Sequence, residues 1–428
     1  MLGNPRRLRQ VRSLSYASTR LIDPTVDICN VMPFRKLKIL QVVPAYFPAV
    51  RYGGPIRSVH YLAAALVERG HEVHVFTSTL DGPDDVQVPH GTPVLLDGVK
   101  VSYFPVPLLR RLCWCPSMWE ALESAARGGD ILHLHSVFLW PTWAAARIAA
   151  AAELPYVMSP RGMLGKTVIR GKSRLVKSAW IRLFEERNLR NAGAVHVTSE
   201  VEAAELAALD LTVRKVECIP NGVSGPTGHE KHDRGPCSGI TRPYALFLSR
   251  IDWKKGLDRL IESWRWVPDL TLVIAGNDES GYRKKMEDLV ELHGLRDRIV
   301  FVGPVSNAQK WPLYANAMMF VLPSYSENFG NVVAEAMIMG CPVVITPEVG
   351  LAPLVSSSGA GVVTDGEPAA LAAVVRDLQH DELRRGVMGA RGRLAARQHL
   401  SWESVASRME QLYIALCSDR AMKRRTAA

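Results

Sequence analysis

The chain has 428 residues, of which 47% are hydrophobic and 22% charged, a composition typical of a globular protein long enough for two domains. No apolar run reaches the roughly 18 residues of a membrane-spanning helix, and residues 143–154 are interrupted by Arg147 and Glu153. Seven scattered cysteines complete no zinc-ligand pattern, so we expect a reducing cytosol. The net charge of +10 favours anionic partners, but no nucleic-acid-binding motif accompanies it, so we expect no nucleic acid.

The first 35 residues are rich in arginine and show no sustained hydrophobic periodicity. We expect residues 1–35 to form a disordered N-terminal extension, because they offer little apolar surface to offset the entropy of ordering. A targeting or membrane-touching tail is one alternative, although the apolar centre of a signal peptide is missing. An upstream start-codon assignment is another, since Met32 stands just before the first predicted strand.

Short apolar runs then alternate with helical segments. A loop follows the first run, and its Gly53 and Gly54 would let the backbone approach a ligand closely. This rhythm is typical of a doubly wound parallel sheet, and we assign residues 36–223 to a first Rossmann-like domain. The strands are predicted at Lys38–Val43, His71–Thr77, Val99–Val106, Asp130–His135, Tyr156–Ser159, Ala194–Thr198 and Val216–Pro220.

A polar stretch rich in glycine and proline, residues 224–243, has no periodicity and predicts a linker. We assign residues 244–400 to a second α/β domain and expect an amphipathic helix at 401–417 to pack back on the first. Two such domains would face a central cleft that holds the ligand. The second set of strands is predicted at Tyr244–Ser249, Leu270–Ala275, Arg298–Val302, Met319–Leu322 and Cys341–Ile345.

The segment from Arg161 to Arg190 contains nine Lys or Arg residues against two acids. Trp180 and Phe184 accompany this charge at helical spacing. A basic helix with aromatic anchors is typical of membrane-surface binding or of an electrostatic funnel for anionic substrates. The simpler alternative is a solvated helix over the core.

The segment 324–342 predicts a turn and a helix between two strands of a parallel sheet. Glu327 stands just before this helix and Glu335 about two turns inside it. Backbone N–H groups of the first helical turn favour an anion at the carboxyl edge of the sheet. Carboxylates beside an anion need hydrogen-bond donors, and sugar or ribose hydroxyls are suitable ones.

Six motifs occur in a defined order: YGGP, HLH, SPRGML, IPNGV, SRIDWKKGLD and SENFGNVVAEAM with its two glutamates. Over roughly residues 36–416 the chain resembles the group 1 (family 4) retaining glycosyltransferases of the GT-B architecture, exopolysaccharide-biosynthesis type. The resemblance implies that Glu335 holds the nucleotide ribose and that Glu327 faces the donor sugar. It also implies that backbone amides line the sugar and phosphate site, those of Phe329, Gly330, Asn331 and Val332. Asn328 departs from the glycine common at its position.

The resemblance implies that Arg250 and Lys255 neutralise the diphosphate leaving group. An isolated pair of surface cations would be the simpler interpretation, and Lys254 is an alternative to Lys255. On the first domain, the resemblance implies that His135 lies near the reacting end of the donor sugar and hydrogen-bonds a sugar hydroxyl or the acceptor. His133 is its alternative and a candidate acceptor contact.

The resemblance further implies that Gly53 and Gly54 contact phosphate or acceptor. Arg161 would bind an acceptor or the donor sugar, with a structural ion pair as its alternative, and Asn221 and Gly222 would shape the interdomain crossing.

The implied function is transfer of a sugar from a UDP- or GDP-linked donor to a hydroxyl of a glycan acceptor, with retention. The acceptor is expected to be lipid-linked and the product a cell-surface polysaccharide, made at the inner face of the plasma membrane. No Asp-x-Asp pair occurs, so we expect no metal and no cofactor beyond the nucleotide-sugar co-substrate. The alternatives are a GT-B phosphorylase, a sugar-nucleotide epimerase, and a non-catalytic sugar-nucleotide-binding subunit of a polysaccharide assembly complex.

Overall fold

The structure is a computed structural model that describes residues 35–49, 51, 53–165, 169, 174–226, 240, 243–278 and 281–427. The predicted extension 1–35 lies outside these ranges except for Arg35, and so does most of the predicted linker 224–243. The chain divides into two units, Met1–Lys36 and Leu37–Ala428, and the fold is that of the second.

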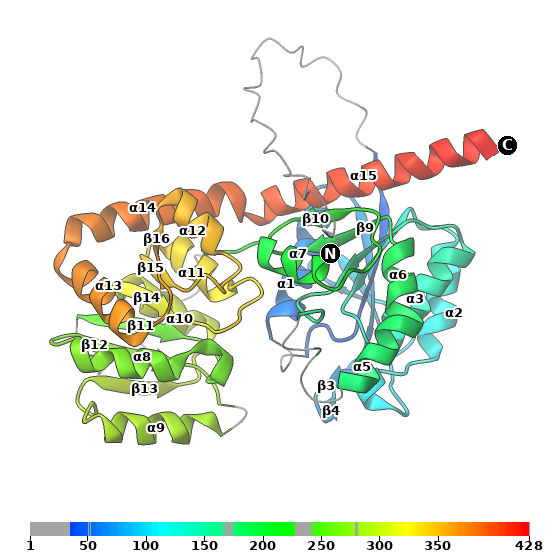
Figure 1. The fold of residues 1–428 in the computed structure, drawn as a ribbon. Coiled ribbons are helices and arrows are strands. Elements are labelled where there is room, and N and C mark those ends of the chain that lie inside the picture. The colour runs from blue at the N-terminus through cyan, green and yellow to red at the C-terminus, as the bar shows by residue number, and fades with distance from the viewer. Residues whose placement is uncertain are drawn as a thin grey trace, which may run out of the picture. The chain divides into compact units, whose positions relative to one another are not determined.

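The first sheet occupies the amino-terminal half of this unit (Figure 1). Its strands are β1 (Lys38–Val43), β2 (Glu72–Ser78), β5 (Val94–Leu96), β6 (Val99–Phe104), β7 (Ile131–His135), β8 (Tyr156–Ser159), β9 (Ala194–Val197) and β10 (Val216–Cys218). Their order is β10-β9-β8-β7-β1-β2-β6-β5, and neighbours are parallel except for β5 against β6. A separate small sheet pairs β3 (Leu80–Asp81) with β4 (Asp84–Asp85).

The second sheet is parallel throughout the residues described. Its strands are β11 (Tyr244–Leu248), β12 (Thr271–Ala275), β13 (Ile299–Gly303), β14 (Met319–Leu322), β15 (Val343–Ile345) and β16 (Gly361–Val363). The order β13-β12-β11-β14-β15-β16 reverses direction beside β11, as in a doubly wound fold. The predicted α/β class with two Rossmann-like domains is therefore confirmed.

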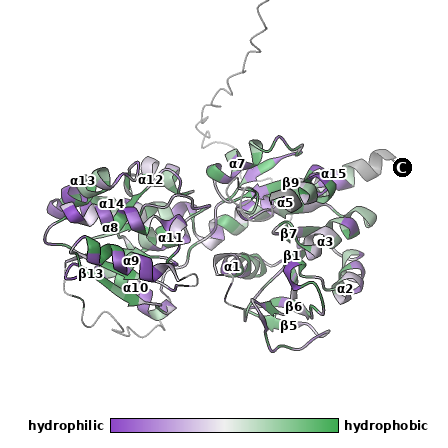
Figure 2. Cartoon of the chain, turned by 60° about the horizontal axis from the view of Figure 1, so that its bottom comes forward, coloured by the Kyte–Doolittle hydropathy of each residue, from purple (hydrophilic) through white to green (hydrophobic). Residues whose placement is uncertain are grey.

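Helices connect these strands and cover both faces of the sheets. In the first half they are α1 (Gly54–Glu68), η1 (Arg110–Leu112), α2 (Ser117–Ala126), α3 (Trp140–Ala151), α5 (Arg174–Trp180), η2 (Ile181–Glu185), α6 (Glu186–Asn191) and α7 (Glu200–Ala207). In the second half they are η4 (Trp253–Lys255), α8 (Leu257–Ser263), η5 (Trp264–Trp266), α9 (Tyr282–Leu292), α10 (Asn307–Asn316), α11 (Asn331–Met339), α12 (Ala352–Ser358), α13 (Pro368–His380), α14 (Glu382–His399) and α15 (Trp402–Ala427). Most mix hydrophobic and hydrophilic residues, as amphipathic helices do (Figure 2).

The alternation of side chains along the first sheet explains its two covering layers. Ile39 and Val43 pack in one buried cluster with α1 and α15, whereas Leu40 and Val42 pack in another with α2 and α3. Because a parallel strand is buried on both faces, it reads as a continuous apolar run, which is why these strands are predictable.

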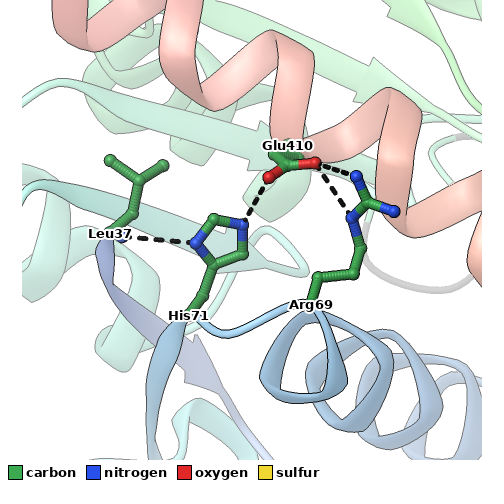
Figure 3. Close-up of polar contacts among 4 residues, drawn as sticks. All are labelled: Leu37, Arg69, His71 and Glu410. Atoms are coloured by element: carbon green, nitrogen blue, oxygen red, sulfur yellow. Dashed lines mark hydrogen bonds and ion pairs between the residues drawn. The ribbon is translucent and has the colours of Figure 1, made fainter. Parts of the chain in front are cut away.

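The last helix, α15, returns to the first sheet after the second has been completed. The prediction ended it at residue 417, but it runs to Ala427 (Figure 1). Glu410 on this helix is buried and accepts hydrogen bonds from Arg69 and from Nε2 of His71, at 3.0 Å (Figure 3). The other ring nitrogen of His71, Nδ1, accepts a hydrogen bond from the Leu37 N–H.

In the part of the chain that the structure describes, none of the helices has the length and hydrophobicity needed to span a membrane.

Candidate functional site

The predicted site residues follow the strands at which each sheet changes direction. After β1 of the first sheet, Gly53 precedes α1 and Gly54 begins it, and His135 ends the neighbouring strand β7. In the second sheet, Arg250 follows β11 and Glu327 follows the adjacent β14. Such switch points at the carboxyl edge are where open α/β sheets bind ligands.

The loop before α11 is fixed by backbone hydrogen bonds. The N–H of Tyr325 donates to the carbonyl of Lys254 at 2.7 Å, and Glu327 exchanges backbone bonds with the loop after β15. Gly330 precedes the helix at φ 97°, a left-handed conformation that favours glycine. The first N–H groups of α11 then have no carbonyl in a preceding turn, so this helix end can receive an anion.

Each of the two glutamates faces a lysine. Glu327 forms an ion pair with Lys255, and both side chains are mostly buried, at 18% and 13% exposure. The predicted partners are a phosphate for Lys255 and a sugar for Glu327, whereas in the structure these two side chains pair with each other. Arg250 is exposed at the end of β11. The loop thus brings together an acid and a lysine.

Glu335 is held by two residues of α10 that the sequence analysis missed. Its Oε1 pairs with the ammonium of Lys310 at 2.6 Å, and its Oε2 accepts from the Tyr314 hydroxyl at 3.2 Å. Burial, followed by the nearby carboxylate of Glu335, raises the pKa of Tyr314 well above its usual value, so the phenol remains a donor. No spacing signal links Lys310 to Glu335, because their contact depends on how α10 packs beside α11.

The remaining predicted residues of this loop have different surroundings. Phe329 is 3% exposed and its side chain belongs to the core of the second half, so only its backbone is available to a ligand. The side chain of Asn331 accepts from Asn221 at 3.3 Å. A Cβ on Gly54 would lie 2.8 Å from Nδ2 of Asn331, so the start of α1 approaches the start of α11 closely, and a larger residue at 54 would displace the Asn331 side chain. Val332 is partly buried against the same core.

His135 and Arg161 form a second group on the first half. An Arg161 amino group donates to Nδ1 of His135 at 3.2 Å, and another donates to Asn221 at 2.8 Å. Burial, with added repulsion from His133 and Arg161, keeps the pKa of His135 well below its usual value, so the ring is neutral. Because Nδ1 accepts, Nε2 carries the proton, and in the part of the chain described this buried atom has no hydrogen-bond partner.

Arg161 itself adopts φ 57°, a left-handed backbone conformation. Burial lowers the pKa of Arg161 to about 10, so the guanidinium is still cationic at neutral pH.

His133, the predicted alternative to His135, has no ring nitrogen left for an acceptor. Its Nδ1 bonds the Tyr413 hydroxyl and its Nε2 the Ser159 hydroxyl, both at 2.6 Å, and the side chain is fully buried. The rings of His133 and His135 are 4.0 Å apart, as expected for alternate residues on one strand face. The structure therefore gives His133 a supporting place beneath His135 and does not favour the predicted acceptor contact.

Family models match both halves of the chain. Residues 53–222 match the glycosyl transferase 4-like domain, and residues 235–395 match the glycosyl transferases group 1. The two matches together include every candidate site residue. The chain belongs to the group 1 glycosyltransferases.

Relatives of this glycosyltransferase span nearly its whole length. It is 27% identical over 402 residues to a D-inositol 3-phosphate glycosyltransferase of Xylanimonas cellulosilytica, covering 88% of this chain and 93% of that protein. Sucrose-phosphate synthase from Thermosynechococcus elongatus superposes with a TM-score of 0.68 at 23% identity, over 90% of this chain and 100% of that one. HepE of Anabaena, solved with UDP and glucose, gives 0.69 at 19% identity, over 89% and 100%. These structural likenesses establish the GT-B fold of the glycosyltransferase.

Proposed function

We propose that this glycosyltransferase moves a sugar from a UDP- or GDP-linked donor to a hydroxyl of a glycan acceptor, with retention at the anomeric carbon. The observation that carries the proposal is the pairing of Glu327 and Glu335 with lysines beside the amino terminus of α11. Acids that accept from hydroxyls and cations that neutralise phosphate are what a nucleotide sugar requires. The likeness to HepE, solved with UDP and glucose, supports this donor class.

In this proposal Glu335 binds the ribose. A carboxylate has about four acceptor positions, and Lys310 and Tyr314 use one on each oxygen. The remaining lone pairs can accept from the two ribose hydroxyls. The diphosphate would then lie against the first N–H groups of α11, with Arg250 and Lys255 supplying positive charge.

During transfer, the bond between the anomeric carbon and the phosphate oxygen breaks, and its electron pair leaves with the nucleoside diphosphate. The acceptor oxygen forms the new bond on the same face of the sugar, and its proton passes to the departing phosphate. Lys255 and Arg250 would stabilise the charge that develops on that phosphate. His135 would donate its Nε2–H to a sugar hydroxyl, since its neutral ring has that proton available. No metal and no further cofactor enters the proposal.

A lipid-linked saccharide in cell-surface polysaccharide synthesis is the proposed acceptor. The support is the basic segment around α5 and α6, where Arg182, Arg187 and Arg190 are exposed and Leu183 is 68% exposed. Trp180 and Phe184, predicted as membrane anchors, instead pack against each other with ring centroids 4.7 Å apart. Leu183 among arginines would therefore be the apolar contact with an anionic membrane surface.

The donor is tested by mass spectrometry of products from a panel of UDP- and GDP-sugars with saccharide acceptors. Wild type is expected to use a subset of the panel, while Glu335→Ala and Arg250→Ala each lose activity by about a hundredfold or more. Glu403→Ala, an exposed glutamate on α15, is the matched control. Full activity in both site variants would refute the site, and no transfer from any donor would refute the reaction.

The membrane contact is tested by co-sedimentation with vesicles of anionic and neutral lipid at low and high salt. Leu183→Glu should reduce binding to anionic vesicles, whereas Leu292→Glu, at a residue 76% exposed on the second half, should not. Equal binding to anionic and neutral vesicles would rule out the proposed membrane-binding surface.

A further inference from the structure

A single buried carboxylate connects the two halves of the candidate site. Glu202 on α7 is 3% exposed and accepts from the N–H of Gly162 at 2.5 Å and from the side chain of Asn328 at 3.2 Å. Gly162 directly follows Arg161 in the first half, and Asn328 directly follows Glu327 in the second. Glu202 therefore holds the chain neighbours of two site residues that come from different sheets.

Two further hydroxyl groups of the first half contact Asn328. The Ser199 hydroxyl donates to the backbone carbonyl of Asn328 at 2.6 Å, and the side-chain amide of Asn328 donates to the Thr198 hydroxyl at 2.9 Å. That hydroxyl in turn donates to Glu202 at 3.0 Å, and the Thr198 N–H donates to the same oxygen at 2.8 Å. Because the Glu202 carboxylate only accepts, the Thr198 hydroxyl donates to it and is left to accept from Asn328.

Packing leaves little room for this contact to move. A Cβ on Gly162 would lie 3.0 Å from Cγ of Asn328, and one on Gly350 would lie 2.1 Å from the carbonyl oxygen of Asn328. One glycine from each half thus lies directly against the asparagine. A buried network of this kind favours one well-defined arrangement, because the groups that are paired here would lose their partners in any other.

We infer that Glu202, Thr198 and Asn328 form an interdomain latch that sets the positions of Glu327 and Arg161 for sugar transfer. These are positioning residues, since they act through the backbone of their neighbours. The inference rests on the proposed function for the role of Glu327. It also explains the asparagine at 328, because glycine there could not donate to Glu202.

The test uses the full chain with Asn328→Ala and Asn328→Asp. In Asn328→Ala, kcat with the nucleotide-sugar panel should fall about tenfold or more, because small displacements of reacting groups are costly to rate. The Kd for UDP or GDP should stay within about twofold, since Glu335, which is proposed to bind the ribose, is held by Lys310 and Tyr314 and not by the latch.

Asn328→Asp places a second carboxylate beside Glu202, and repulsion between the two is relieved when they share a proton. Its kcat relative to wild type should therefore be lower at pH 8 than at pH 6, a dependence that loss of packing alone would not produce. Asn191→Asp, at an exposed residue ending α6, should show no such dependence. Wild-type kcat in both Asn328 variants at every pH would overturn the latch.

A readout independent of catalysis separates this inference from the proposed function. Amide hydrogen exchange should quicken in Asn328→Ala around residues 324–331, which lose the bonds to Thr198 and Glu202, and around residues 160–165, because Gly162 loses the side chain that packs against it. Unchanged exchange in both segments would reject the latch, whatever the donor. Quickened exchange in a protein that transfers no sugar would keep the latch and reject the proposed reaction.

Discussion

The two glutamates of the 324–342 segment differ in how they are held. Glu335 is bonded on both oxygens, by Lys310 and Tyr314, and so presents its remaining lone pairs in a set direction. Glu327 has its ion pair with Lys255, a flexible cation that a diphosphate can attract away. The first arrangement suits recognition of a fixed group, and the second suits a site whose charge changes during reaction.

Lys310→Met should weaken binding of the nucleotide, because Glu335 loses the charge-assisted bond that orients it. The expected increase in Kd for UDP or GDP is about tenfold, corresponding to roughly 1.4 kcal/mol. Isothermal titration calorimetry measures it, with the exposed Lys284→Met as control. Unchanged or tighter binding would contradict the orienting role.

Lys255→Ala should act mainly on kcat, since the proposed interaction with phosphate strengthens as charge develops. A loss of about a hundredfold is expected, comparable to removal of one donor from an oxyanion site. Steady-state kinetics with the preferred donor separates this from a change in KM. A pure KM effect would show that Lys255 binds ground state and transition state equally.

At the scale of elements, α15 joins the end of the chain to the beginning of the fold. Glu410 reaches Arg69 and His71, more than three hundred residues away in sequence (Figure 3). Tyr413, one turn further, reaches His133 beneath the site. The helix therefore completes the hydrophobic core of the first half. It also holds His133, whose ring packs against that of His135.

Glu410→Ala should destabilise the first half by about 3 kcal/mol, because Arg69 and His71 would lose the carboxylate that accepts their hydrogen bonds. Urea unfolding followed by circular dichroism measures the loss. Glu403→Ala, at an exposed residue in the first turn of α15, should change the free energy of unfolding by less than about 0.5 kcal/mol. Equal effects of the two substitutions would argue against an anchoring role.

At the scale of the whole molecule, three neutral histidines lie together in the core of the first half. Burial lowers the pKa of His196 to about 3 and holds the pKa values of His133 and His135 well below the usual value. The unfolded chain takes up protons on these rings near pH 6.5, whereas the folded chain does not. Stability should therefore fall as the pH drops below about 6.5.

Urea unfolding at pH 7.5, 6.5 and 5.5 tests this expectation. Each histidine can remove up to about 1.4 kcal/mol per pH unit once the pH is below its unfolded pKa. The exposed His90→Gln should leave the dependence unchanged. A flat free energy of unfolding between pH 7.5 and 5.5 would show that these rings are protonated in the fold.

The sequence by itself determined the elements and the class of fold. Apolar runs such as Met319–Leu322 and the glycine stop at Gly340 encode strand and helix end within a few residues, so local pattern is sufficient. Short strands were less visible: β16 has three residues and begins with Gly361, which carries no side chain to mark a strand. The spacing of Glu327 and Glu335 is likewise a local feature, because both residues belong to this one loop and helix.

Only the tertiary structure decided which groups these residues meet. Three sets of contacts join segments that are distant in sequence. They are the ion pair of Lys310 with Glu335, the hydrogen bonds at both ring nitrogens of His133, and the bonds of Glu202 to Gly162 and Asn328. The identity of a buried charge's partner depends on how whole elements pack, and no periodicity records it. The segment 324–342 could thus be recognised from its own residues, whereas its ion pairs and its latch depend on α10, η4 and α7.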